Sequence, residues 1–352
     1  MYRYSLATLV VAGHLFPALM RNALTPHYAV FGFYVLSGFL MSCILNNNYG
    51  FTFTGIKAYV INRFLRIFPT YWLVILLAFF IIKMYPVPAE ALRPCLTMPD
   101  TILEWIQNIF ILGLGSTFGT SLAEVRMSPP AWTLHIELLF FLAMPFIVGN
   151  KKRTAAWALL SIMLTSYALY NHQPYPYRYI PVQAASLPYS LGALLYFTCN
   201  TIDGRTLKFN LSCLVIFLIA FFLNLIFVPK FSNPQELPFY INLFLHIGII
   251  AFLSKIPRDR IPTKIFLADK FLGDLSYPIF LIHWPIAVLV SVIAFNGKMP
   301  AGFSEQGAFF CFSLPAINVS AIIIYLLLEK RTQKIRERIR PHMANLKIIG
   351  KH

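Results

Sequence analysis

The order of apolar and polar positions along the chain is that of a membrane protein built from helices. Ten apolar segments are each about as long as the 17 to 25 residues that a helix needs to cross a bilayer. None shows the period-two alternation that marks the strands of a membrane β-barrel. The predicted spans cover residues 4–20, 28–45, 67–84, 131–149, 155–170, 184–199, 209–228, 238–254, 275–295 and 305–328. We therefore expect an all-α, polytopic membrane helical bundle.

The segments between these spans are short, which indicates a single domain. We expect one transmembrane domain over residues 1–328, followed by a basic amphipathic tail over residues 329–352 on the inner membrane surface. The largest stretch outside the spans is 85–130, which we expect on the outer side with a short interfacial helix near 105–114. No polar stretch is long enough for a second soluble domain.

The composition agrees with a membrane protein. Hydrophobic residues make up 58% of the chain and charged residues 12%, whereas a soluble domain carries about twice that charge. The mean hydropathy is +0.67.

The net charge of +16 is informative through its distribution. If the N-terminus is cytoplasmic, 22 of the 29 Lys and Arg residues fall on the inner side, and both termini are cytoplasmic. The seven expected outside are Arg21, Lys83, Arg93, Arg126, Arg178, Lys230 and Lys298. The surplus is a topology signal and a contact for anionic membrane lipid, so nucleic acid is excluded as a partner.

His14 lies about halfway along the first predicted span, where an ionisable side chain is costly and usually functional. Eleven residues at about 100° each return to within about 20° of the same helix face, so Arg3 and His14 lie on one face about 16 Å apart. A phosphate-bearing molecule held by Arg3 would extend its reactive end toward His14. A positive-inside anchor at Arg3 and a helix-packing histidine remain the alternative.

Arg63 and Arg66 lie three residues apart, on one face of a short amphipathic stretch ahead of the third span, and Pro69 favours a break or a helix start there. Paired guanidiniums suit a phosphate or diphosphate because each is a rigid fork of donors that stays charged. Anionic-lipid contact is the alternative.

Glu137 is one of the few acidic residues within a predicted span, two residues after His135. A carboxylate there needs a partner, which we expect to be His14, the hydroxyl of an acceptor, an arginine, or a purely structural basic group. The His-x-Glu spacing is not that of a zinc protease, and no metal site is expected.

A further histidine, His283, lies in the ninth span between two prolines, which free backbone carbonyls as they do around membrane cavities. Gly273 and Asp274 precede it and are expected to form a turn at the cytoplasmic edge. Packing roles remain open for His283 and for His246.

Together these segments, in this order, resemble the acyltransferase-3 family of bacterial membrane acyltransferases, which O-acetylate cell-envelope and exported polysaccharides. The departures are Tyr34 and Thr133 where the family has Phe and Ser, and Phe31 and Gly32 where an acidic residue is often found. The matching motifs are Arg-x10-His (Arg3, His14), aromatic-aromatic-x-x-Ser-Gly (Phe33, Tyr34, Ser37, Gly38), Arg-x-x-Arg (Arg63, Arg66), Trp-Ser-Leu-x-x-Glu (Trp132, Thr133, Leu134, Glu137) and Ser-Tyr-x-x-x-Leu-x-His (Ser276, Tyr277, Leu281, His283).

The resemblance implies a multi-pass enzyme of the bacterial cytoplasmic (inner) membrane. It would move an acetyl or similar acyl group from cytoplasmic acyl-CoA, a donor substrate and not a resident cofactor, to a hydroxyl of a saccharide or glycolipid. Arg3, Arg63 and Arg66 would hold the nucleotide end of acetyl-CoA. His14 would act as general base or acyl-accepting nucleophile, with Glu137 orienting it.

The remaining motif residues are expected to bind substrate or to support the site: Tyr34, Ser37, Trp132, His135, Ser276, Tyr277 and His283. A transporter or flippase of a lipid-linked saccharide is the competing class, although we find no inverted repeat. The acceptor, the acyl chain and a homo-oligomeric state stay open.

Overall fold

The computed structural model describes residues 1–20, 24–199, 207–227 and 232–339 of the chain. Within these ranges the regular structure is helical and contains no strand, which confirms the all-helical fold. The α-helices are α1 (Tyr2–Leu15), α2 (Pro17–Met20), α3 (Thr25–Ile44), α4 (Phe53–Met84), α5 (Pro86–Leu92), α6 (Ile102–Phe110), α7 (Ala131–Ile147), α8 (Lys151–Tyr170), α9 (Val182–Cys199), α10 (Leu207–Ile226), α11 (Leu237–Ser254), α12 (Thr263–Ala294), α13 (Phe303–Ile324) and α14 (Lys330–Ile339). π-Helical turns follow α3 (Leu45–Tyr49) and α13 (Tyr325–Glu329), and short 3-10 turns occupy Tyr175–Arg178 and Arg258–Arg260.

Helices occupy every predicted span. Six helical segments are long and apolar enough to cross a membrane, as expected of a multi-pass membrane protein: Thr25–Tyr49, Phe53–Met84, Leu207–Ile226, Leu237–Ser254, Thr263–Ala294 and Phe303–Ile339. The other predicted spans fall on α1, α7, α8 and α9, which are shorter or less apolar. Ten crossings and two cytoplasmic termini stay predictions.

Some sequence-based expectations concern residues outside the described part of the chain. These are the last residue of the predicted span 209–228, residues 340–352 of the expected tail, and six of the cations used to orient the bundle. Those cations are Arg21, Arg205, Lys230, Arg340, Lys347 and Lys351.

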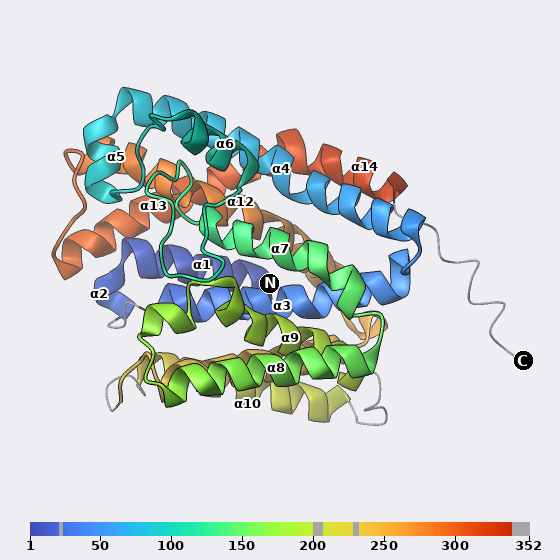
Figure 1. Ribbon diagram of the computed structural model, residues 1–352. Helices are drawn as coiled ribbons and strands as arrows, with labels where there is room; N and C mark the ends of the chain where they lie inside the picture. The colour runs from blue at the N-terminus through green and yellow to red at the C-terminus, as the bar shows by residue number, and fades with distance from the viewer. Residues whose placement is uncertain (21–23, 200–206, 228–231, 340–352) are drawn as a thin grey trace, which may run out of the picture.

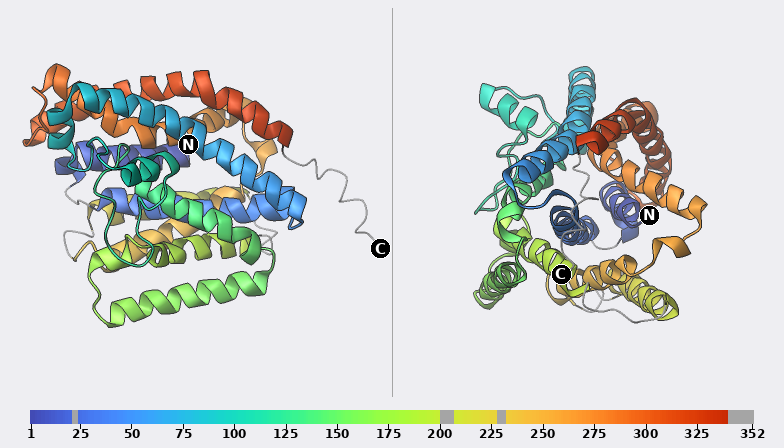
Figure 2. Two further views of the ribbon diagram at one scale, coloured as in Figure 1. Left: turned by 45° about the horizontal axis from the view of Figure 1, so that its top comes forward. Right: turned by 90° about the vertical axis from the view of Figure 1, so that its right-hand side faces the viewer.

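Helices α1 and α3 lie at the centre of the bundle (Figure 1). In the view along the helices in Figure 2, the other helices surround this pair, with α4, α12 and α13 on one side and α9, α10 and α11 on the other. The central position agrees with burial, because α1 buries Leu6, Val10 and Val11 and α3 buries residues along its length. Side chains on α1 and α3 therefore face protein on most sides.

Two glycines set the distance between α3 and α9. A Cβ atom on Gly38 would lie 2.2 Å from the carbonyl oxygen of Tyr189, and one on Gly192 would lie 2.0 Å from the carbonyl oxygen of Val35. Because the opposing atoms are backbone, no side chain can move to make room. Small residues of this kind let membrane helices approach closely. Gly38 follows Ser37, so this contact also fixes where Ser37 points.

The predicted break at Pro69 is wrong, because α4 runs without interruption from Phe53 to Met84 with Pro69 inside it. The turn expected at Gly273 and Asp274 is likewise wrong, since both lie within α12. A proline removes one backbone hydrogen bond, but in a membrane helix neighbouring groups can re-satisfy the freed carbonyl. In α12, Pro285 has no N–H for the carbonyl of Leu281, and the hydroxyl of Ser128 donates to that oxygen at 3.2 Å.

The C-terminal helix continues the bundle. α13 passes through the π-helical turn Tyr325–Glu329 directly into α14, and α14 packs against α4 (Figure 1). Glu329 is 3% exposed at this junction. Residues 330–339 therefore lie against the half of α4 that carries Arg63 and Arg66.

Candidate functional site

A cavity of about 870 Å³, including its open mouth, lies among α1, α3, α4, α7 and α12. We call it the arginine cavity because Arg3, Arg63 and Arg66 all line it, together with Glu137. Two helices, α1 with Arg3 and α4 with Arg63 and Arg66, thus bring the predicted phosphate-binding cations to one place. Its other polar lining residues are Tyr34, Ser37, Thr133, Ser276 and Tyr277.

The arginines of this cavity differ in their partners. Arg66 forms an ion pair with Glu329, with 2.8 Å between Nη1 and Oε2, and the hydroxyl of Thr70 donates to the other oxygen of Glu329 at 2.6 Å. Arg3 and Arg63 form no ion pair with any residue that the structure describes. The guanidinium of Arg63 lies 5.6 Å from the centre of the Tyr59 ring. Arg3 and Arg63 are therefore the cations left for an anionic ligand.

Glu137 faces the arginines. The positive charges that act on its carboxylate are Arg63, then Arg3, then Arg66. Of the partners considered for it, the structure places the arginines nearby and His14 in a different cavity. His135, two residues earlier, points elsewhere: its Nδ1 lies 3.2 Å from both the N–H of Gly113 and the carbonyl oxygen of Ile111, so it contacts the loop after α6 and lines neither cavity.

The motif residues on α3 and α12 support the arginine cavity. Tyr277 donates a hydrogen bond to the carbonyl oxygen of Ile67 at 2.9 Å, and the guanidinium of Arg66 lies 5.5 Å from its ring centre. The hydroxyl of Ser276 donates to the carbonyl of Gly273 at 2.7 Å. Tyr34 stacks on Tyr189 of α9 with 5.0 Å between ring centres.

A second cavity of about 440 Å³ contains His14, and we call it the histidine cavity. Aromatic and basic side chains dominate its wall, with His27, Arg93, Trp132, Tyr179 and Trp284 beside His14. The remaining lining residues are Val10, Pro26, Val30, Pro129, Pro130, Thr133 and Phe280.

His14 and His283 form a hydrogen-bonded pair. Nδ1 of His14 lies 3.1 Å from Nε2 of His283, and the rings are stacked with an interplanar angle of 12°. Nδ1 of His283 lies 2.8 Å from the carbonyl oxygen of Phe280. A carbonyl can only accept, so this Nδ1 carries the hydrogen and Nε2 of neutral His283 is an acceptor. His14 must then donate through Nδ1.

This pairing fixes the tautomer of His14. A neutral imidazole that carries its hydrogen on Nδ1 has a lone pair on Nε2, and no hydrogen bond among the described residues uses Nε2 of His14. The basic nitrogen of His14 is therefore available in the histidine cavity. His283, for which the sequence left a packing role and a supporting role open, accepts this hydrogen bond and holds His14 in this state.

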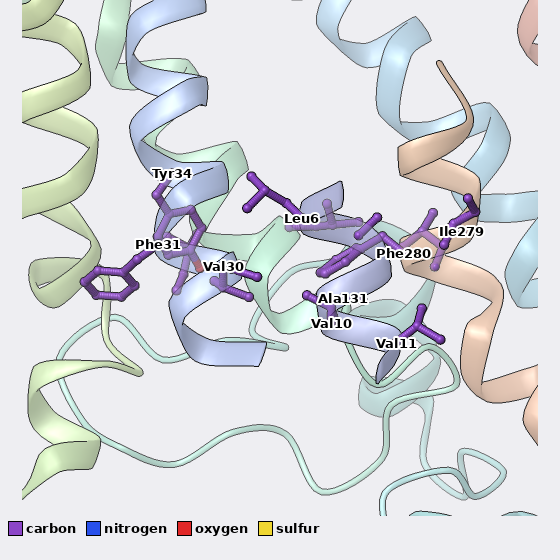
Figure 3. Close-up of a cluster of buried hydrophobic side chains, with 14 of the residues drawn as sticks. Leu6, Val10, Val11, Val30, Phe31, Tyr34, Ala131, Ile279 and Phe280 are labelled. Atoms are coloured by element: carbon purple, nitrogen blue, oxygen red, sulfur yellow. The ribbon is translucent and has the colours of Figure 1, made fainter. Parts of the chain in front are cut away.

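The two cavities share the lining residues Val30, Thr133 and Phe280. In Figure 3, buried side chains of α1 lie between α3 and α12, next to Val30 of α3 and Phe280 of α12. The ring of Phe280 packs edge to face on Phe33, with 5.8 Å between ring centres. Few side chains therefore separate the arginine cavity from the histidine cavity.

Sequence reasoning missed several residues of these cavities. His27, Arg93 and Trp284 line the histidine cavity, Phe280 separates the cavities, and Glu329 pairs with Arg66. Phe280 lies inside a matched motif and Trp284 directly follows it, and Glu329 is an acidic residue at the end of an apolar run, so all three had a signal in the sequence. His27 and Arg93 lie outside every motif.

A family model described as an acyltransferase domain, that of the acyltransferase-3 family, matches residues 3–326. An uncharacterized protein of Aquifex aeolicus (strain VF5) is 26% identical over 215 residues, which is 59% of this chain and 89% of that protein. No solved structure matches.

Proposed function

We propose that this chain, which belongs to the acyltransferase-3 family, moves an acetyl or similar acyl group from acyl-CoA to a hydroxyl of a saccharide or glycolipid. One observation carries the proposal. A cavity with three arginines and a cavity with a tautomer-fixed histidine lie in one bundle and share the wall formed by Val30, Thr133 and Phe280.

The donor fits the arginine cavity. Guanidiniums bind phosphate through paired, charge-assisted hydrogen bonds, and among the described residues no carboxylate forms an ion pair with Arg3 or Arg63. Arg3 and His14 lie on one helix, eleven residues apart and thus about 16 Å along its axis. In our proposal the pantetheine arm covers this distance and carries the thioester past Phe280 to His14.

The acceptor fits the histidine cavity. Trp132, Tyr179 and Trp284 line it with aromatic rings, and the histidines and Arg93 line it with nitrogen atoms that can form hydrogen bonds. A cavity with both kinds of group suits a sugar, which has apolar faces and a rim of hydroxyls.

The reaction follows from the lone pair on Nε2 of His14. As the acceptor oxygen attacks the thioester carbonyl, Nε2 takes the hydroxyl proton. The imidazolium that forms is stabilised by the hydrogen bond from its Nδ1 to His283. The C–S bond of the tetrahedral intermediate then breaks, the sulfur receives the proton from Nε2, and an ester and free CoA result.

An acyl-histidine intermediate is the alternative chemistry. Nε2 of His14 would attack the thioester itself, and the acceptor would then take the acyl group from His14. Only this route allows labelled CoA to exchange into acetyl-CoA when no acceptor is present, so an exchange assay distinguishes the two.

Glu137 has a different proposed role from the one expected at first. It lines the same cavity as Arg3, Arg63 and Arg66, and their positive charges act on its carboxylate, so we propose that it positions the arginines and limits their repulsion. The transporter alternative is not supported by the family match.

The direct test uses the purified full chain reconstituted with host membrane lipid and glycan. With acetyl-CoA labelled in the acetyl group, we expect label to accumulate in a saccharide or glycolipid fraction as free CoA is released. If the protein binds acetyl-CoA and yet transfers no label to any fraction, the proposal fails. The same assay with membranes of a bacterial host tests the proposed location in the cytoplasmic membrane.

A further inference from the structure

The C-terminal helix α14 carries a cation toward the arginine cavity. Residues 330–339 follow the end of the family match at residue 326, and α14 lies along α4 (Figure 1). Arg331, Lys334 and Arg338 of this helix are exposed, whereas Arg336 is partly buried. Arg336 is thus the cation of α14 that faces its neighbours.

Two polar contacts fix α14 on α4. At its start, Glu329 bridges Arg66 and Thr70. One turn farther toward the beginning of α4, Asn62 donates to the backbone carbonyl of Arg336 at 2.8 Å and accepts from Nε of Arg336 at 3.0 Å. Asn62 is 4% exposed, so this pair of hydrogen bonds is shielded from water. Asn62 therefore holds Arg336 at two points, its backbone carbonyl and its side chain.

The contact with Asn62 leaves the other end of the guanidinium available. Nε is used, while no hydrogen bond or ion pair among the described residues uses the two terminal nitrogens of Arg336. The positive charges that act on Arg336 are Arg66 and Arg63, and the carboxylate of Glu329 acts on it with the opposite sign. Three guanidiniums within electrostatic range repel one another, and Glu329 pairs only with Arg66. A bound anion would remove this repulsion.

We propose that Arg336 is a further donor-binding residue and contacts the 3′-phosphate of acyl-CoA. The inference rests on the proposed function, which places the thioester deep, at His14. The nucleotide then lies at the opposite end, and its 3′-phosphate is the phosphate group farthest from the thioester. Arg336 lies one turn farther out along α4 than Arg66, at the place where this phosphate would emerge.

The test measures the dissociation constants of acetyl-CoA and acetyl-dephospho-CoA, which lacks the 3′-phosphate, on the purified full chain. We expect Arg336→Gln to weaken acetyl-CoA binding about 10- to 100-fold, the effect of losing a charge-assisted phosphate contact. Binding of acetyl-dephospho-CoA should not change, which also shows that the variant is folded. Arg336→Lys should recover part of the affinity, because it keeps the charge and loses the fork.

Arg338→Gln is the matched control, since it removes one charge from the exposed side of the same helix. It should leave both constants unchanged. Equal loss for both ligands in Arg336→Gln, or no loss beyond that of Arg338→Gln, would overturn the assignment of Arg336. If the unaltered protein binds neither ligand, the proposed function itself fails, which is a different outcome.

Discussion

Replacing His283 by alanine removes the acceptor of the His14 Nδ1–H and separates the role of the histidine pair from that of the donor site. Without His283, both tautomers of His14 become accessible, and the imidazolium loses its partner. A hydrogen bond to a charged group contributes about 1.5–3 kcal/mol, so kcat should fall about 10- to 100-fold. KM for acetyl-CoA should stay near its original value, because His283 lines neither the arginine cavity nor its mouth.

The assay is steady-state transfer of labelled acetyl groups by His14→Ala, His283→Ala and the double variant. Loss of a positioned general base lowers the rate about 10²- to 10⁴-fold, so His14→Ala should be the more severe single change. Because His283 acts through His14, adding His283→Ala to His14→Ala should cost nothing more. His283→Gln restores an acceptor near the position of Nε2 and should recover part of kcat. A normal kcat in His283→Ala, or additive effects in the double variant, would refute the reasoning.

Two other predictions come from the structure and one from the charge pattern of the sequence. Arg63→Gln should weaken acetyl-CoA binding without changing thermal stability. Arg66→Gln should also lower the free energy of unfolding by about 3–5 kcal/mol, because it leaves the buried carboxylate of Glu329 without its ion pair. Equal Tm values for the two variants would contradict this. Val30→Phe should narrow the connection between the cavities and lower transfer about 10²-fold through misplacement of the thioester, with donor affinity retained; full activity would show that the acyl group takes another path. In a cysteine-free background, a cysteine at Lys152 should resist an impermeant thiol reagent in intact cells while one at Thr97 reacts, and the reverse pattern would invert the orientation.

The helices and their approximate bounds could be predicted from the sequence, because long apolar runs must form helices in a bilayer. The interruptions predicted at Pro69 and at Gly273 were wrong. Packing against neighbouring helices outweighs the tendency of proline and glycine to end a helix at these two places. Local propensity reports on one segment, whereas Tyr277 and Glu329 contact α4 from more than 200 residues away. Such contacts have no trace in the local pattern.

Many residues of the candidate site could be predicted from the sequence, but their division between two cavities could not. Arg3, Arg63 and Arg66 meet in one cavity, as a shared phosphate-binding role would require. Whether Glu137 would face them or face His14 depends on how α7 is rotated about its axis and how deep it lies. Contacts such as Gly38 against α9 set the spacing of neighbouring helices, and such contacts cannot be read from one segment alone.

The central claim is that His14 performs the chemistry and that the donor is held elsewhere. The most direct measurement is the specific activity of monodisperse His14→Ala protein, taken together with its dissociation constant for acetyl-CoA. We expect transfer to fall at least about 10²-fold. The dissociation constant should stay within about twofold of the original, which is well below the tenfold change that a loss of about 1.4 kcal/mol in binding free energy produces. Substantial transfer by this variant, with donor binding intact, would contradict the account.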